Sequence, residues 1–105
     1  MRYTRNNKKE HCYYVYILAN RRNGTIYIGV TSDLFNRTFQ HKLKENFNSF
    51  TAKYNISKLV YYEEYVCVGD AIKKEKQLKK WNRQWKIELI EKYNPTWRDL
   101  FEDMK

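Results

Sequence analysis

Arg37 and His41 are the first pair of residues in the chain whose types and spacing point to chemistry. The run from Asp33 to Asn46 contains neither Gly nor Pro, and Thr31-Ser32-Asp33 supplies three possible N-caps, so a helix is predicted here. Residues one turn apart share a face of that helix. A guanidinium makes forked contacts with a phosphate, and an imidazole exchanges a proton near neutral pH. A solvated face with an Asp33–Arg37 ion pair explains the same spacing, and the spacing alone favours that simpler interpretation.

Glu75 is the most informative single residue, because it is the only acid in a strongly basic stretch. The basic residues of 73–86 are Lys73, Lys74, Lys76, Lys79, Lys80, Arg83 and Lys86. At helical spacing it lies on the stripe of Ala71, Ile72 and Leu78, which is the apolar side. A carboxylate in that position must be paired, protonated or bound to a cation. Mg²⁺ or Mn²⁺, completed by waters and phosphate oxygens, fits one such carboxylate. A buried ion pair with Arg37 is the alternative, and composition does not separate the two.

Two tyrosines lie in neighbouring segments that are both rich in β-branched and aromatic residues. CYYVYILAN (12–20) and TIYIGV (25–30) predict strands, and Asn23-Gly24 between them predicts the turn of an antiparallel hairpin. Side chains alternate between the two faces of a strand, so a loop of two, four or six residues places Tyr16 and Tyr27 on one face. A two-residue turn leaves them about 13 Å apart, at roughly 3.3 Å per residue, whereas a wider loop brings them side by side. The sequence leaves this register open.

The remaining elements give an α+β fold with a small three-stranded antiparallel sheet flanked by helices. After a polar connection at 47–57, KLVYYEEYVCV (58–68) predicts the third strand, and Gly69-Asp70 ends it and can cap the next helix. Residues 71–93 predict one long helix, or two helices bent near Asn82, because they contain no Gly or Pro. Thr96 is the expected cap of a last short helix, and residues 12–105 form one domain preceded by a flexible basic arm at 1–11.

The charge of the chain predicts a polyanionic partner. Twenty-one Lys and Arg residues stand against 12 Asp and Glu residues, which gives a net charge of +9, and ten tyrosines accompany them. Such a combination favours nucleic acid. Candidate contacts include Gly29, because a glycine at a strand end permits close approach by another backbone or a ligand. The other candidate contacts are Lys73, Lys74, Lys79 and Lys80.

Two further features bear on the compartment. No apolar run approaches the length of about 18 residues that a bilayer requires, and residues 1–11 lack the apolar segment of a secretory signal. A soluble, cytoplasmic protein without membrane contact is therefore expected. Cys12 and Cys67 each fall inside a predicted strand, so two buried free thiols in a reducing compartment are expected rather than a disulfide or a zinc site.

Set in chain order, these residues resemble the GIY-YIG nuclease family, in particular its short stand-alone bacterial members, which are related to the catalytic domain of the excision-repair nuclease. Tyr14-Val15-Tyr16 stands where the first motif belongs, and Tyr27-Ile28-Gly29 matches the second letter for letter. GVTSDLFNRTFQH (29–41) is similar to the helix that carries the family's arginine and histidine, and 71–97 is similar to the segment with its metal-binding glutamate. The resemblance extends from Tyr13 to about Leu100.

The chain departs from the family pattern at two positions, and a third position has two possible assignments. Tyr14 replaces the glycine of the first motif, which varies within the family. Val30 stands where several relatives have a lysine that helps position the water, and this substitution bears on the rate rather than on the fold. The family's active-site asparagine corresponds to Asn94, with Asn82 as the competing assignment.

The resemblance implies a DNA endonuclease that hydrolyses a phosphodiester in one step, serving repair or recombination. A tyrosine takes a proton from water or relays its own proton to His41, Arg37 stabilises the phosphorane, and Mg²⁺ or Mn²⁺ on Glu75 stabilises the leaving 3′ oxygen. An ionised phenol at pH 7 costs about 4 kcal/mol, so Arg37 and the metal must lower the pKa of the tyrosine.

Two other functions fit fewer of these features. The first is a DNA-binding domain of the same fold that does not cut, or that depends on a partner protein or a homodimer for targeting. The second is a small RNA-binding protein, which leaves Glu75 unexplained.

Overall fold

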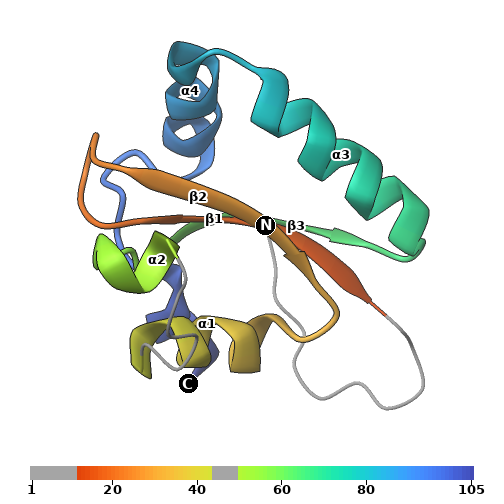
Figure 1. Ribbon diagram of the computed structural model, residues 1–105, viewed down its shortest axis with the longest axis horizontal. Coiled ribbons are helices and arrows are strands. Elements are labelled where there is room, and N and C mark those ends of the chain that lie inside the picture. Colours follow the sequence, from red (N-terminus) through yellow and green to blue (C-terminus); the bar gives the residue numbers. More distant parts are fainter. Residues whose placement is uncertain (1–11, 44–49) are drawn as a thin grey trace.

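A three-stranded antiparallel sheet separates two layers of helices, as the computed structural model of the protein shows for residues 12–43 and 50–105 (Figure 1). The strands are β1 (Tyr13–Ala19), β2 (Ile26–Thr31) and β3 (Lys58–Tyr65), in the order β2-β1-β3. Helices α3 (Val68–Lys80) and α4 (Arg83–Tyr93) cover one face. Helices α1 (Leu34–Leu43) and α2 (Phe50–Lys53) and the 3₁₀ helix η1 (Leu100–Met104) cover the other. The predicted α+β class and its three-stranded sheet are confirmed, while the proposed arm at 1–11 and the predicted helical residues 44–46 lie outside the described residues.

The β1–β2 hairpin has a wider loop than the Asn23-Gly24 turn alone predicts. Ala19 pairs with Ile26, so residues 20–25 form the loop. The loop is closed by Asn20, whose backbone N–H donates to Thr25 O at 3.2 Å and whose Oδ1 accepts from Thr25 N at 2.9 Å. Asn23 adopts a φ of 57°, which asparagine tolerates better than most residues do. The loop length is even, so Tyr16 and Tyr27 share a face, and the register is shifted from that of a two-residue turn.

Alternate residues of β1 supply two separate cores. Val15, Ile17 and Ala19 pack with buried residues of α3 and α4, such as Leu78 and Ile90. Tyr14, Tyr16 and Leu18 face the other way, toward a core that includes Leu34, Ile56 and Phe101. Because helices cover both faces of the sheet and β1 is its central strand, the side chains on both sides of β1 are buried, including Tyr14 and Tyr16.

The helical layer on the Val15 face consists of two helices rather than one. Trp81 leaves the helical region with a ψ of 150°, and Asn82 caps α4 by accepting a hydrogen bond from Trp85 N at 2.9 Å. The alternative of a bend near Asn82 is thus confirmed. Arg83 then donates to the backbone carbonyls of Asn23 and Gly24 at 2.7 Å, which ties α4 to the hairpin loop.

The third strand is shorter than predicted, and this changes the surroundings of the cysteines. β3 ends at Tyr65, and Cys67 occupies the N-cap position of α3, exposed to solvent. Cys12 precedes β1 and is half-buried. Both are free thiols, as predicted, but the expectation that they lie buried within strands is wrong. Apolar, β-branched character continues to Val68, but the chain has already left the sheet when α3 begins there.

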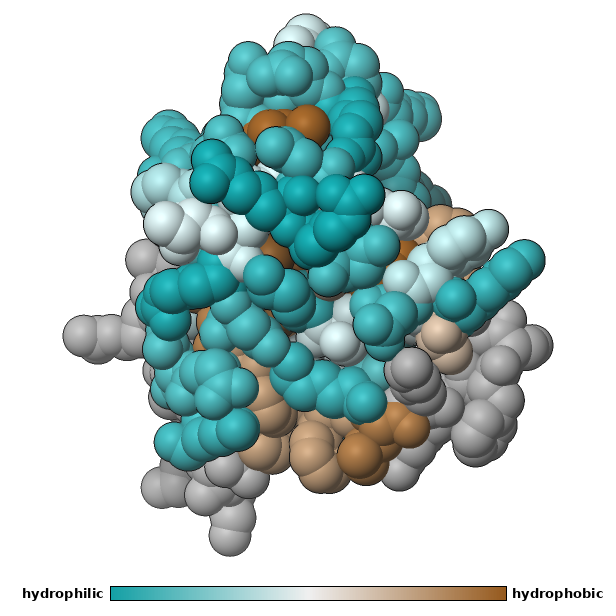
Figure 2. Space-filling model, turned by 90° about the vertical axis from the view of Figure 1, so that its left-hand side faces the viewer, coloured by the Kyte–Doolittle hydropathy of each residue, from teal (hydrophilic) through white to brown (hydrophobic). Residues whose placement is uncertain are grey.

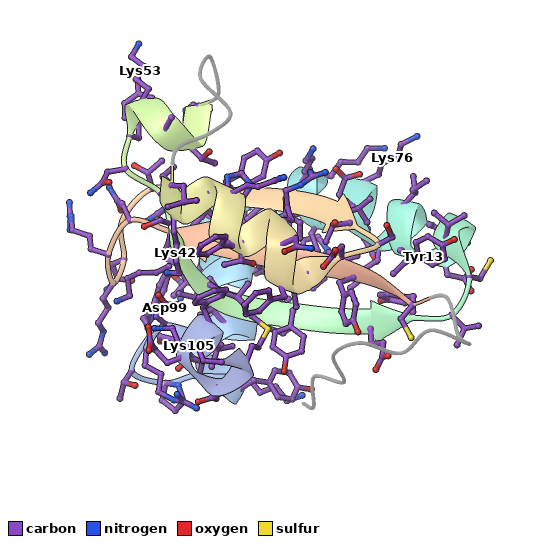
Figure 3. The ribbon with its side chains drawn as sticks, turned by 90° about the horizontal axis from the view of Figure 1, so that it is seen from below. Tyr13, Lys42, Lys53, Lys76, Asp99 and Lys105 are labelled. Carbon is purple, nitrogen blue, oxygen red and sulfur yellow. The ribbon has the colours of Figure 1, made fainter. Side chains whose placement is uncertain are left out.

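Two local predictions on the Tyr16 face also differ from the structure. The connection predicted at 47–57 contains α2, and the 3₁₀ helix η1 is capped by Asp99 rather than by Thr96, since Asp99 Oδ1 accepts from Phe101 N at 3.1 Å. Figure 3 shows Lys42 of α1 pointing toward the same aspartate, and the two form an ion pair that joins α1 to the C-terminal segment. In the described residues, no helix has the length and apolar character needed to cross a membrane.

Candidate active site

Three aromatic rings from three elements meet on the face of the sheet that α1 and α2 cover. The ring centroids of Tyr16 and Tyr27 are 6.3 Å apart, and the His41 ring lies 6.2 Å from the first and 5.6 Å from the second. Tyr16 comes from β1, Tyr27 from β2 and His41 from the buried side of α1. The structure therefore brings together these three of the predicted site residues, although 25 positions separate Tyr16 from His41.

Gly29 makes room for this arrangement. It pairs with Tyr16 across the two strands, and a Cβ atom on Gly29 would lie 2.6 Å from the Tyr16 hydroxyl oxygen and 2.7 Å from Cζ. The close approach that this glycine allows is thus made by a side chain of the same domain, the Tyr16 ring, rather than by the backbone or ligand that the sequence suggested. Any larger residue would displace the ring.

His41 is held at both of its ring nitrogens. Nε2 lies 3.4 Å from the Tyr16 hydroxyl, and Nδ1 lies 2.8 Å from Oγ1 of Thr51 in α2. His41 and Thr51 are only 5% and 2% exposed, so water does not replace either contact. Sequence reasoning missed Thr51, because α2 lies in a segment that predicted only a polar connection.

Arg37 lies one turn before His41, and neither of its predicted partners holds its guanidinium. Asp33 accepts from Asn36, and Glu75 pairs with Lys79. None of the ion pairs formed by the described residues includes Arg37. It lines an open hollow of about 450 Å³, together with Thr31, Ser32, Asp33, Asn36, Phe39 and Gln40. Its charge therefore remains available to an anion.

The electrostatics of the cluster differ from the expectation at the tyrosine. Burial raises the pKa of Tyr16 above its usual value, and Tyr27 raises it further, while the neighbouring Arg37 lowers it without reversing the shift. Burial lowers the pKa of His41, and the positive charge of Arg37 acts in the same direction. At neutral pH the phenol accordingly keeps its proton and the imidazole is uncharged.

The match to known proteins agrees with this geometry. The sequence model of the GIY-YIG catalytic domain matches residues 12–94 of the chain. The chain belongs to the GIY-YIG family. UPF0213 proteins from two strains of Staphylococcus epidermidis are each 31% identical to it over 83 residues, which cover 75% of this chain and 94% of the relative. No solved structure matches the chain.

The range matched by the GIY-YIG model contains Glu75, which lies on α3, in the helical layer on the other side of the sheet from α1. Its side chain is 18% exposed and lies on the same side of the helix as the buried Ala71 and Leu78, whereas Ile72, which was predicted to share that stripe, is exposed. Its carboxylate pairs with Lys79 at 2.8 Å, one turn along the same helix. The described residues contain no group of three or more His, Cys, Asp or Glu side chains that could hold a metal ion. Glu75 therefore offers a single hard ligand, with an ammonium group already bound to it.

Asn94 and Asn82 both perform structural tasks in the GIY-YIG domain. Asn94 is buried, donates from Nδ2 to Val60 O and Arg98 O, and accepts at Oδ1 from Arg98 N. These bonds fasten the end of α4 to β3. Asn82 is the N-cap of α4. The hydrogen bonds of both residues go to backbone atoms outside the aromatic cluster, so neither side chain is brought to Tyr16 and His41 by them.

The lysines predicted to contact nucleic acid lie on α3. Lys73, Lys79 and Lys80 are exposed, whereas the Lys74 ammonium lies over the Trp81 ring, 5.6 Å from its centre. Viewed from the α1 side in Figure 3, Lys76 extends past the β2 edge of the sheet. The basic helix is thus on the face opposite α1, but it reaches the edge strand that carries Tyr27. Figure 2 shows a largely hydrophilic surface on the side of α4 and the hairpin loop, with apolar side chains gathered at its lower edge, on the layer of α1.

Proposed function

We propose that the domain is an endonuclease that hydrolyses a phosphodiester of DNA, with His41 as the final proton acceptor. The observation that carries this proposal is the Arg37 guanidinium, held by no carboxylate of the described residues, beside a hydrogen-bonded Tyr16–His41 pair. A domain that served only to bind DNA would have no need for a buried proton acceptor next to that cation. Membership of a nuclease family supports the same reaction.

The proton moves through Tyr16 to His41. Tyr16 has a raised pKa and is a poor phenolate, so the mechanism with an ionised tyrosine as base is disfavoured. A water that attacks phosphorus gives its proton to the Tyr16 oxygen as the Tyr16 proton passes to Nε2 of His41, 3.4 Å away. The lowered pKa of His41 favours a neutral imidazole at the start, and a neutral imidazole has one ring nitrogen that can accept the proton. Tyr27 closes the cluster on its other side and keeps the two rings in place.

Arg37 binds the phosphate group and stabilises the charge that develops on it. Its fork of N–H donors suits two phosphate oxygens, and the hollow that it lines opens to solvent. A contact that strengthens as negative charge builds on the phosphorane accelerates the chemical step. The net charge of +9 draws the polyanion toward the domain.

Glu75 is the proposed ligand of a Mg²⁺ or Mn²⁺ ion. One half-buried carboxylate fits such an ion when waters and phosphate oxygens complete its coordination. The bound metal supplies Lewis-acid stabilisation of the leaving 3′ oxygen. Lys79 competes for the same carboxylate, so the domain by itself holds the ion weakly. Repair or recombination of DNA is the proposed setting, and it rests on the resemblance to excision-repair nucleases.

A second candidate function is a DNA-binding domain that does not cut. The Glu75–Lys79 pair favours it, because the carboxylate is already neutralised. The two functions differ in one assay, in which purified protein is incubated with supercoiled, nicked and branched DNA in Mg²⁺, Mn²⁺ or EDTA.

In that assay we expect cleavage in either metal and none in EDTA. Arg37→Ala should lower the rate by about 10²–10³-fold, since it removes an interaction made in the transition state. Arg22→Ala is the matched control, because Arg22 is an exposed arginine of the hairpin loop. If no form of DNA is cut in either metal but all are bound, the non-cutting function takes the place of the endonuclease.

A further inference from the structure

Thr51 is placed against His41 by an element that the sequence did not predict. α2 is a single turn, and Thr51 is its buried residue. The Thr51 carbonyl accepts a hydrogen bond from Ile56 N at 2.8 Å, and Ile56 belongs to the core under Tyr16 and Leu18. The backbone of Thr51 is thereby fixed to the same core that holds Tyr16. A hydroxyl so firmly held can determine the orientation of the ring that it contacts.

The direction of the Tyr16–His41 hydrogen bond determines which ring nitrogen of His41 is the acceptor and which is the donor. In the proposed mechanism the Tyr16 hydroxyl, which retains its proton at neutral pH, donates toward Nε2 across their 3.4 Å contact. A neutral imidazole that accepts at Nε2 carries its hydrogen on Nδ1. The Nδ1–H group then donates to Thr51 Oγ1 over the 2.8 Å contact. With the other tautomer, Nε2–H would point at the Tyr16 oxygen, and His41 would have no lone pair for the proton of Tyr16.

We infer that Thr51 is a positioning residue, which fixes His41 in the Nδ1–H tautomer and directs the lone pair of Nε2 at the Tyr16 hydroxyl. This inference rests on the proposed function, in which His41 accepts the proton. The groups that face His41 are Tyr16 from β1, Tyr27 from β2 and Arg37 from its own helix. None of these groups contacts Nδ1 in place of Thr51. Loss of the Thr51 oxygen therefore leaves a buried N–H group without an acceptor.

The test compares three substitutions of buried threonines. Thr51→Val keeps the shape and removes the acceptor, while Thr51→Ser keeps the acceptor. Thr38→Val is the matched control, because Thr38 is fully buried on the same side of α1 as His41 and its hydroxyl has no partner among the described residues. Each variant is examined by ¹⁵N NMR of the imidazole and by the pH dependence of kcat with Mg²⁺ and a DNA substrate that the wild type cuts.

The wild type, Thr51→Ser and Thr38→Val should all show the Nδ1–H tautomer, and Thr51→Val should show a mixture. In Thr51→Val, kcat should fall by about 10–100-fold with little change in KM, because a misoriented acceptor affects the chemical step rather than binding. The acidic limb of its kcat profile should move to lower pH, since a neutral acceptor on Nδ1 also stabilises the charged imidazolium.

Two results would overturn the inference. One is a Thr51→Val variant with the wild-type tautomer, kcat and acidic limb. The other is an Nε2–H tautomer in the wild type, which decides the matter even if Thr51→Val does not fold. If the wild type has the expected tautomer, loses it in Thr51→Val and yet cuts no DNA, the proposed function fails while the role of Thr51 in fixing the ring is supported.

Discussion

The two faces of the sheet differ in the pairing of certain polar side chains, although the same central strand lies between them and the α1 face also holds the Lys42–Asp99 ion pair. On the face covered by α3 and α4, polar groups are neutralised by their neighbours: Tyr61 and Tyr65 both donate to Glu63, and Trp97 donates to Glu91 at 2.7 Å. On the face covered by α1 and α2, Arg37 has no carboxylate partner in the described part of the chain, and the Tyr16–His41 contact is long, at 3.4 Å.

The difference indicates that Arg37 and the Tyr16–His41 pair are the polar groups whose interactions a ligand could complete. Buried polar groups that are fully paired make a layer rigid, whereas a cation with no carboxylate partner and a long hydrogen bond leave interactions that the substrate of the proposed reaction would complete. The exception is Glu75, which lies on the α3 side and is neutralised by an exposed lysine, Lys79, that a ligand could displace. Four variants or conditions test the comparison between the faces.

The largest effect is expected at Glu75. Glu75→Gln keeps the size of the side chain but removes the charge that holds a cation, so cleavage in Mg²⁺ should be abolished. DNA affinity measured in EDTA should be equal or slightly higher, because a carboxylate that repels phosphate is gone. Glu102→Gln is the matched control, since Glu102 is also paired with a lysine one turn away, at 3.1 Å. Undiminished cleavage by Glu75→Gln would show that Glu75 of α3 does not take part in the reaction.

Tyrosine hydroxyls on the two faces should behave differently. Tyr16→Phe should lower the rate of cleavage by about 10²–10⁴-fold, because that hydroxyl transfers the proton in the proposed mechanism. Tyr61→Phe, on the other face, should leave the rate within about twofold and lower the free energy of unfolding by about 1 kcal/mol through loss of its bond to Glu63. Single-turnover cleavage and urea denaturation measure the two quantities. Equal effects of the two variants on the rate would refute the distinction between the faces.

The pH dependence of cleavage reports on His41. Its pKa is lowered in the folded domain by burial and by Arg37, so the acidic limb of the rate profile should have its midpoint below pH 6.5. The stability that His41 contributes as a neutral group is present above the unfolded pKa, and it is lost as the pH falls through the lowered folded pKa. The measurement is kcat against pH between about 5 and 8. A midpoint above pH 6.5 would contradict an uncharged His41.

The smallest effect is expected from the exposed lysines of α3. Combining Lys73→Ala with Lys80→Ala should make the slope of log K against log salt shallower by about 0.9 for each phosphate that is no longer neutralised, without changing the chemical step. Lys105→Ala serves as the control, because Lys105 is paired with Glu102 at the end of the described chain. Binding in EDTA at several salt concentrations gives the slope. An unchanged slope would mean that this helix is only a solvated surface.

Local features of the sequence determined much of the candidate site. The two-residue period of a strand put Tyr16 and Tyr27 on one face, and the helical period put Arg37 one turn from His41. The same period placed Glu75 on the apolar stripe of its helix, and the order of all five residues pointed to the GIY-YIG family. The periods of a strand and of a helix are set by hydrogen bonds and steric contacts between residues close together in the chain. They can therefore be read from the sequence without the tertiary structure.

Only the tertiary structure decided how these groups meet. The loop at 20–25 selected the register that lays the Tyr16 ring over Gly29. The pairing of His41 with Thr51 came from the packing of separate elements, whereas Glu75 pairs with Lys79 of its own helix rather than with Arg37 of α1. Burial raised the pKa of Tyr16 where neighbouring cations alone predicted a decrease. Register, burial and long-range hydrogen bonds depend on the free energy of the whole packed domain, which no local spacing in the chain records.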